Sequence, residues 1–156
     1  MPERISSETR SRMMSGIRGR DTQPERLIRG HLHAEGFRFR LCRKDLPGKP
    51  DIVLPRWKTA IFAHGCFWHG HQGCALFRVP KTRTEFWSDK ISRNAQRDEA
   101  AIEALREMGW RVAVVWECAL RAEQSRTLQS LVSFVRSKEE FTEIASLPIV
   151  IPTPGE

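Results

Sequence analysis

The chain has 156 residues, of which 40% are hydrophobic, and it carries a formal net charge of +7 at neutral pH. This length and composition are typical of one globular domain that buries a core without disulfide bonds. No apolar run approaches the ~18–20 residues of a membrane span, and the start "MPERISSETRSRMM" lacks the apolar core of a secretory signal. We therefore expect a protein of the reducing cytosol, where cysteines are read as metal ligands rather than as disulfides.

The positive charge is concentrated in one part of the chain. Residues 1–88 contain 17 Lys and Arg against 8 Asp and Glu, whereas residues 89–156 contain 9 against 11. The basic part also contains the densest group of histidines and cysteines. Positive charge beside a candidate site indicates contacts with phosphates and favours a nucleic acid as the partner. A basic surface that only keeps the protein soluble is the alternative.

The first part of the chain predicts an arm, a helix and three strands. Residues 1–20 are basic and weakly patterned, and we expect a DNA-binding arm there. A helix is predicted next, because Thr22 and Glu25 have the spacing of a capping box and Pro24 fits a first turn. The three predicted strands cover residues 37–42, 51–55 and 59–65.

The rest of the chain predicts two helices around a buried strand. A long helix is expected over residues 82–109, an apolar strand over residues 110–117 and a last amphipathic helix over residues 125–141. The expected buried stripe of the long helix consists of Ile91, Ala95, Ile102, Leu105 and Met108.

This order of elements indicates an α/β (α+β) fold, in which helices flank a central sheet. No linker is strong enough to divide the chain into two globular domains. The expected division is a basic DNA-binding arm at residues 1–20, one domain at residues 21–140 and a loose C-terminal tail at residues 141–156.

The stretch "IFAHGCFWHGHQGC" contains a dense set of metal-ligand side chains. Cys66, His69, His71 and Cys74 lie within nine residues, and Cys118 follows the apolar strand. A structural zinc ion takes four sulfur or nitrogen ligands in a tetrahedron, so three cysteines and one histidine would suffice. The spacing leaves open whether His69 or His71 is the ligand, and the other histidine would be free for chemistry. Reduced cysteines and loop histidines that bind nothing are the alternative.

A carboxylate stands at the start of a predicted strand in "KPDIVLP", and the next strand ends near His64. Magnesium is bound by one or two carboxylates, with waters and substrate phosphate oxygens completing its shell. Asp51 is therefore a candidate Mg²⁺ ligand, which would stabilise charge on a phosphate and help to activate water. Pro-Asp after a turn is common, so an ordinary turn residue is the alternative.

Four stretches, "PDIVLP", "IFAHGCFWHGH", "TRTEFW" and "GWRVAVVWECAL", together resemble the very-short-patch-repair (Vsr) DNA mismatch endonuclease family. The resemblance extends from about Thr9 to about Arg121. It implies a restriction-endonuclease-like fold with a central mixed β-sheet and a structural zinc site. It also implies a Mg²⁺-dependent hydrolase that nicks duplex DNA on one strand, 5′ to the thymine of a T:G mismatch.

The resemblance also assigns roles around the magnesium ion. Asp51 becomes the metal-binding carboxylate, and the backbone carbonyl of Ala63 becomes a second contact, although many family members have threonine there. His69 becomes the base that activates water, which suits imidazole because its ordinary pKa lies near neutrality. His64 and Glu25 become catalytic residues that assist through water. For Glu25, a role in the helix cap is an equal alternative.

The zinc ligands implied by the family are Cys66, His71, Cys74 and Cys118. The loop "HGHQGC" is one residue longer than in many relatives, so we expect its geometry to differ while the ligand set persists. Cys42 stands apart from this group and is expected to be a small buried residue.

Aromatic residues beside the metal ligands suggest a wedge that enters DNA. A mismatch enzyme must open the base stack, and flat apolar side chains can replace the lost stacking at a cost of a few kcal/mol. Ordinary core packing is the alternative for such aromatics, and we expect it for Trp110 and Trp116. The intercalating residues implied by the family are Met14, Phe67, Trp68 and Trp87.

The implied partner is double-stranded DNA with a T:G mismatch that arises from deamination of 5-methylcytosine. A functional link to a DNA cytosine-5 methyltransferase follows. The resemblance further implies a monomer of the bacterial cytoplasm that associates with the nucleoid when it is bound to DNA. Two other hypotheses remain: a restriction-like nuclease with another target, and a zinc-stabilised DNA-binding module without catalysis.

Overall fold

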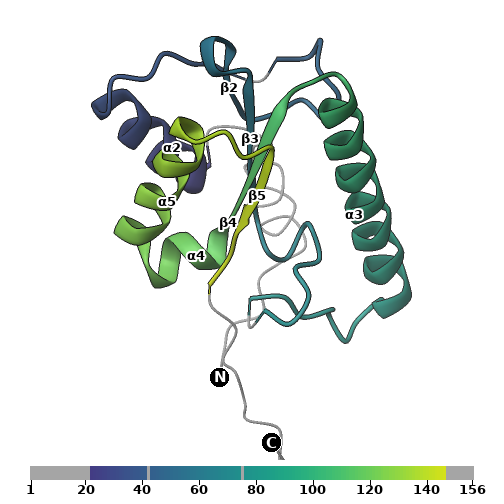
Figure 1. Cartoon of the computed structure of the whole chain (residues 1–156). Coiled ribbons are helices and arrows are strands. Elements are labelled where there is room, and N and C mark those ends of the chain that lie inside the picture. The colour runs from purple at the N-terminus through teal and green to yellow at the C-terminus, as the bar shows by residue number, and fades with distance from the viewer. Residues whose placement is uncertain (1–21, 42, 75, 147–156) are drawn as a thin grey trace, which may run out of the picture.

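The computed structural model describes residues 22–41, 43–74 and 76–146. Its five strands form one sheet with the spatial order β1 (Arg40–Leu41), β2 (Ile52–Leu54), β3 (Thr59–His64), β4 (Arg111–Trp116) and β5 (Phe141–Ile144) (Figure 1). β2 pairs antiparallel with β1 and with β3, whereas β3 and β5 pair parallel with β4. The sheet is therefore mixed. The predicted arm with Met14, and also Cys42, lie outside the described residues.

Helices cover both faces of this sheet. They are α2 (Gln23–Ala34), α3 (Thr84–Glu107), α4 (Glu117–Ala122) and α5 (Gln124–Arg136), and a short 3₁₀ helix, η1 (Pro55–Trp57), joins β2 to β3. α2, α4 and α5 lie on one side of the sheet, and α3 runs along the other side (Figure 1). None of the helices in the described ranges is both long and apolar enough to cross a membrane.

Two cores result from the alternation of side chains along the strands. Ile61 and Ala113 belong to the core shared with α2 and α5, whereas Phe62 and Val112 belong to the core shared with α3. Because both faces of β3 and β4 are covered, these strands are almost continuously apolar in sequence, as predicted.

The start of α2 follows the predicted cap. The Thr22 hydroxyl accepts a hydrogen bond of 3.4 Å from the backbone N–H of Glu25, and Pro24 stands in the first turn. Ile28 and Leu32 are fully buried against the sheet. The local signals for this helix were sufficient because the cap and the apolar stripe agree with each other.

Arg111 connects the beginning of β4 to the end of α5. Its guanidinium donates to the backbone carbonyls of Phe134, Val135 and Ser137, which lie at the C-terminal end of the helix. It also donates to the Thr59 hydroxyl in β3 at 3.2 Å. One side chain thus donates to three carbonyls at the end of the helix, and it fixes α5 to the sheet.

The structure corrects three expectations and adds a helix. The last helix, predicted to reach residue 141, ends at Arg136. Residues 141–144, assigned to a loose tail, form β5 and extend the sheet beyond β4. Four residues with partial burial give too weak an apolar pattern for prediction. Met108 is 50% exposed, because α3 ends before it and its side chain leaves the buried stripe. The short helix α4 was not predicted.

Candidate functional site

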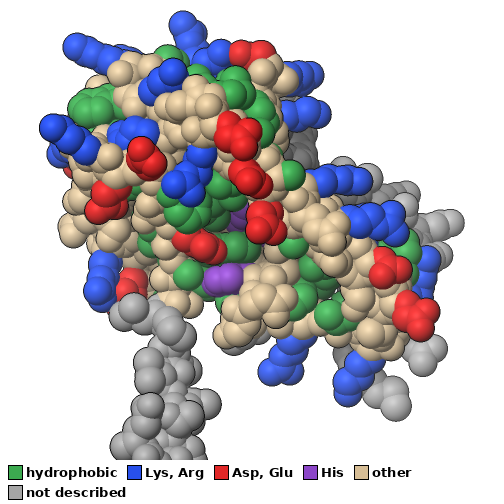
Figure 2. Space-filling view, turned by 45° about the vertical axis from the view of Figure 1, so that its right-hand side comes forward, with side chains coloured by type: hydrophobic (Ala, Val, Ile, Leu, Met, Phe, Trp, Pro, Cys, Tyr) green, Lys and Arg blue, Asp and Glu red, His purple; other side chains and the backbone are tan. Residues whose placement is uncertain are grey.

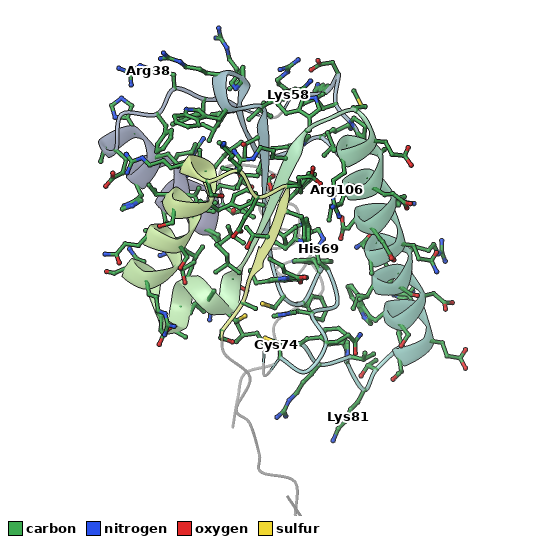
Figure 3. The ribbon with its side chains drawn as sticks, in the orientation of Figure 1. Arg38, Lys58, His69, Cys74, Lys81 and Arg106 are labelled. Carbon is green, nitrogen blue, oxygen red and sulfur yellow. The ribbon has the colours of Figure 1, made fainter. Side chains whose placement is uncertain are left out.

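The candidate site lies where β3 and β4 end. Figure 3 shows His69 and Cys74 at this end of the sheet, on the connection from β3 to α3, while Arg38 and Lys58 lie at the opposite end. Since β3 and β4 are parallel neighbours, the residues that follow them meet at the same edge. Side chains far apart in sequence are therefore brought together here.

One group at this edge combines three cysteines and one histidine. The ligand atoms of Cys66, His71, Cys74 and Cys118 all lie within 4.8 Å of one another. Cys66 follows β3, and Cys118 lies in the first turn of α4, directly after β4. The backbone N–H of His71 donates to the Cys66 carbonyl at 2.9 Å, which closes the loop over the group. This set could hold a metal ion, and three sulfurs and one nitrogen suit tetrahedral zinc.

Burial raises the pKa of the Cys66 thiol, so binding of a metal there must displace a proton. Of the two histidines that the spacing left open, the structure places His71 with the cysteines. His69 points to a different partner. The turn between them passes through Gly70, whose φ of +62° favours glycine and which leaves no room for a side chain beside Ile91.

His69 belongs to a second group, with His64 and Asp98. The Nδ1 atom of His69 lies 2.5 Å from Oδ2 of Asp98, and its ring stacks on that of His64 with centroids 3.9 Å apart. The two imidazole planes are 6° from parallel. Lone pairs in parallel planes do not converge on one point, so this group is better suited to hold a proton than a metal ion.

Asp98 was not identified from the sequence, although a signal for it exists. It stands on α3 between Ile91 and Leu105, seven residues from each, and therefore on the buried stripe of the helix. A half-buried acid on an apolar stripe requires a partner, because a buried charge is costly when it is unpaired. Its partner is the imidazole of His69.

His64 is the most deeply buried member of this group, with 4% of its surface exposed. Burial lowers the pKa of His64 to about 3, with the neighbouring His69 adding to the effect. The ring is therefore neutral at physiological pH. Within the described part of the chain its Nδ1 atom has no hydrogen-bond partner.

Asp51 lies beside this group, at the start of β2. Its Oδ2 atom accepts a hydrogen bond of 2.8 Å from the backbone N–H of Ala63. Burial raises the pKa of Asp51 to about 7; the Ala63 N–H opposes this rise, and the charge of Glu25 adds to it. Two carboxyl groups in a buried place destabilise each other when both are charged, and a divalent cation would relieve this repulsion.

The orientation of Ala63 also suits a cation at Asp51. In an extended strand, the N–H and C=O of one residue point to the same neighbouring strand. The Ala63 N–H points at Asp51, so its carbonyl faces the same side. Glu25 reaches this place from α2, where its side chain is 4% exposed while its backbone serves the Thr22 cap. The two interpretations of Glu25 are therefore compatible.

A cavity of about 540 Å³ opens beside the histidines, between the sheet and α3. Figure 2 shows histidine side chains in a hollow with acidic side chains around it. Asp51 does not line this cavity. The lining includes His64, His69, His71, Asp98, Trp116 and Glu143.

The aromatic residues near the cysteines form one cluster. The ring of Phe67 lies 5.1 Å from that of Trp68 and 5.7 Å from that of Trp87. All three side chains are partly exposed, unlike those of a closed core. The ammonium group of Lys90 lies 5.8 Å from the rings of both tryptophans. The cluster thus presents flat apolar surface with positive charge at its edge.

The two tryptophans expected in the core differ in burial. Trp116 is buried, and Trp110 is partly buried against the core on the α3 side. Met14 lies outside the described residues. The structure places all the other predicted site residues at this end of the sheet.

Comparisons with known proteins identify the family of the chain. A profile of the DNA mismatch endonuclease Vsr family matches residues 3–76. The chain is 52% identical over 120 residues to the type II nicking enzyme V.XorIIP of Xanthomonas oryzae pv. oryzae. The matched region covers 77% of this chain and 88% of that protein. It is 49% identical over 123 residues to the DNA mismatch endonuclease Vsr of Escherichia coli, covering 79% and 78% respectively. The chain therefore belongs to the DNA mismatch endonuclease Vsr family.

Proposed function

We propose that the protein is a Mg²⁺-dependent endonuclease that nicks duplex DNA 5′ to the thymine of a T:G mismatch. The observation that carries this proposal is the proximity of a buried carboxylate pair, Asp51 and Glu25, to the His69–Asp98 pair at one edge of the sheet. A metal-binding carboxylate beside an oriented base is the minimum for phosphodiester hydrolysis. The names of the relatives, a mismatch endonuclease and nicking enzymes, support the same reaction.

Asp51 and the Ala63 carbonyl would hold Mg²⁺, and Glu25 would assist through water. When bound, this ion supplies charge stabilisation on the scissile phosphate and lowers the pKa of bound water. The replacement of a family threonine by Ala63 leaves the carbonyl in place, so metal binding is expected to persist.

His69 would act as the general base. Its Nδ1 atom is engaged by Asp98, which leaves Nε2 to accept a proton from the attacking water. The carboxylate then stabilises the imidazolium that forms, as the acid of a catalytic triad does. The stacked ring of His64 is neutral, so it supports His69 without repelling its positive charge.

A zinc ion at the cysteine group would make the loop of residues 65–74 rigid. Phe67 and Trp68 lie on that loop and Trp87 lies on α3, so a rigid loop would force the DNA to deform when these rings insert. Unstacking costs a few kcal/mol per step and is least costly at a mismatched pair. The protein would select a T:G wobble because that pair costs less to unstack than a matched pair.

Several wider features of the proposal follow from the reaction and the family. The mixed sheet with flanking helices is compatible with a restriction-endonuclease-like fold. A monomer suffices because one strand is cut. The substrate arises where 5-methylcytosine deaminates, so the protein would act in very short patch repair alongside a DNA cytosine-5 methyltransferase. Such an enzyme would work in the cytoplasm, at the nucleoid.

The proposal is tested with a T:G duplex labelled on either strand and its matched T:A counterpart. Mg²⁺ should produce a single nick in the thymine strand of the mismatch, at its 5′ side, and EDTA should prevent it. Activity that is equal in EDTA would contradict the metal assignment. Equal cutting of the T:A duplex would indicate a restriction-like nuclease, and binding without a cut would indicate a DNA-binding module.

A further inference from the structure

Trp116, the last residue of β4, forms one stacked ring pair with His71 and lies against a second pair, His64 and His69. Its indole stacks on His71 of the cysteine group, with centroids 4.0 Å apart and planes 6° from parallel. It also meets His64 and His69 at steep angles of 74° and 77°, with centroids 5.1 Å and 6.4 Å away. Trp116 is therefore the shared wall between the candidate zinc site and the candidate catalytic histidines.

A single hydrogen bond fixes the orientation of this indole. Its Nε1–H donates to Oε1 of Glu143 at 2.6 Å. Glu143 lies on β5, the strand that the sequence did not predict, which pairs parallel with β4. The bond joins two neighbouring strands. β5 therefore supports the site although it lies outside the loop that contains His69 and His71.

The bond matters because the indole has room to move. Trp116 and Glu143 both line the cavity of about 540 Å³, together with His64 and His69. Close packing restrains most buried rings, but a ring at the wall of a cavity lacks contacts on one side. Without the hydrogen bond, rotation of the indole into this space would release the edges of both histidine rings.

We propose that Trp116, held by Glu143, is a positioning residue that keeps the His64–His69 pair oriented beside the candidate zinc site. This inference rests on the proposed role of His69 as the base. Residues that orient an active group from behind typically change its activity 10- to 100-fold, and a displacement of ~1 Å can cost as much. The strand β5 is then needed for nicking because it supplies the carboxylate that holds the Trp116 indole.

The test compares four variants in single-turnover nicking of a T:G duplex. Glu143→Ala removes the acceptor, and Glu143→Gln keeps an oxygen acceptor while it removes the negative charge. Trp116→Phe removes the donor. Glu140→Ala is the matched control, because this exposed glutamate precedes the same strand and pairs only weakly with Arg106, at 3.8 Å.

We expect Glu143→Ala and Trp116→Phe to nick at least about 10-fold more slowly. DNA affinity and zinc content should stay within about twofold of wild type, because the inferred role is to orient the base and neither residue belongs to the Cys/His group. Glu143→Gln and Glu140→Ala should behave as wild type. The double variant Glu143→Ala with Trp116→Phe should be no slower than Trp116→Phe alone, since both changes break one bond.

Three results would overturn the inference. The first is a wild-type rate for Glu143→Ala. The second is an equal loss in Glu143→Gln and Glu143→Ala, which would assign the effect to charge. The third is a loss accompanied by release of zinc. The variant His69→Ala separates the two proposals: if it nicks normally, the assignment of the base fails first.

Discussion

Asp98 on α3 and His69 on the loop after β3 are joined by a hydrogen bond of 2.5 Å, although 29 residues separate them in sequence. The pairing fixes which imidazole nitrogen faces the carboxylate and which faces outward. It depends on the packing of α3 against the end of the sheet, and it links the fold to the proposed chemistry.

Asp98→Asn should slow nicking by at least about 100-fold. An amide cannot stabilise the imidazolium and can favour the wrong tautomer, which is the reason that the equivalent change is so harmful in catalytic triads. The measurement is the single-turnover rate on a T:G duplex, with affinity measured separately. Glu99→Gln is the control, because Glu99 lines the same cavity without contacting His69. A normal rate for Asp98→Asn would show that nicking does not depend on the pairing of Asp98 with His69.

Asp51→Asn should abolish nicking and yet stabilise the metal-free protein at alkaline pH. Because burial raises the pKa of Asp51 from 3.8 to about 7, the folded state binds this proton more tightly than the unfolded chain does. The contribution of Asp51 to the free energy of unfolding of the wild type therefore falls as the pH rises from about 4 to about 7. Above pH 7 the variant should unfold at a temperature higher by about 3 °C or more.

This gain in unfolding temperature should shrink as the pH is lowered toward 5, where Asp51 is protonated in the folded protein. Thermal unfolding in EDTA at several pH values measures it. Asp45→Asn is the control: Asp45 is fully exposed, and its hydrogen bond with Arg43 lowers its pKa. A gain that is independent of pH would show that the buried charge is not its cause.

Phe67→Ala and Trp68→Ala should each weaken binding to a T:G duplex about 10- to 100-fold, which corresponds to the 1–3 kcal/mol typical of one base–aromatic contact. Binding to the matched T:A duplex should change less, since it does not require the wedge. Fluorescence of 2-aminopurine beside the mismatch reports unstacking directly. The control is Met108→Ala, another exposed apolar side chain, at the far end of α3. Equal losses on both duplexes would argue against a wedge.

If the Cys/His group binds zinc as proposed, Cys118→Ser should lower the zinc content and the unfolding temperature, because this group joins the end of β4 to the loop after β3. Structural zinc contributes folding free energy directly. Elemental analysis of the purified protein and thermal unfolding with and without a chelator measure the two effects. Cys42→Ser should retain one zinc ion. A wild-type protein without zinc would refute the assignment.

Arg111→Lys should lower the free energy of unfolding by about 3 kcal/mol, although it keeps the positive charge. A lysine cannot reach the carbonyls of Val135 and Ser137 together, and each unsatisfied buried acceptor costs ~1–3 kcal/mol. The Phe134 carbonyl keeps its hydrogen bonds from Ser137. Urea unfolding measures the loss. Arg126→Lys, on the exposed face of α5, should change stability little.

The sequence predicted those elements whose signals are local. The spacing of Thr22 and Glu25, with Pro24 in the first turn, predicted α2, and an apolar run predicted β4. β5 could not be predicted, because its four residues become a strand only by pairing with β4. Pattern and propensity within so short a segment do not contain that information.

In the candidate site, too, local signals could be predicted from the sequence and non-local contacts could not. The Cys/His group was visible because its members are close in sequence and have an unusual composition. The separation of His69 from His71 depends on the turn at Gly70, and the partnership of His69 with Asp98 depends on helix packing. Neither follows from spacing. The position of Glu143 beside Trp116 requires the complete sheet.

The most direct test of the central claim is a strand-resolved, single-turnover nicking assay of wild type and Asp51→Ala. The duplexes carry T:G, T:A or C:G at one position, in several flanking sequences. We expect one Mg²⁺-dependent nick, 5′ to the thymine of the T:G pair alone, and its loss in Asp51→Ala while DNA binding remains. Undiminished nicking by Asp51→Ala, or equal cutting of the matched duplexes, would contradict it.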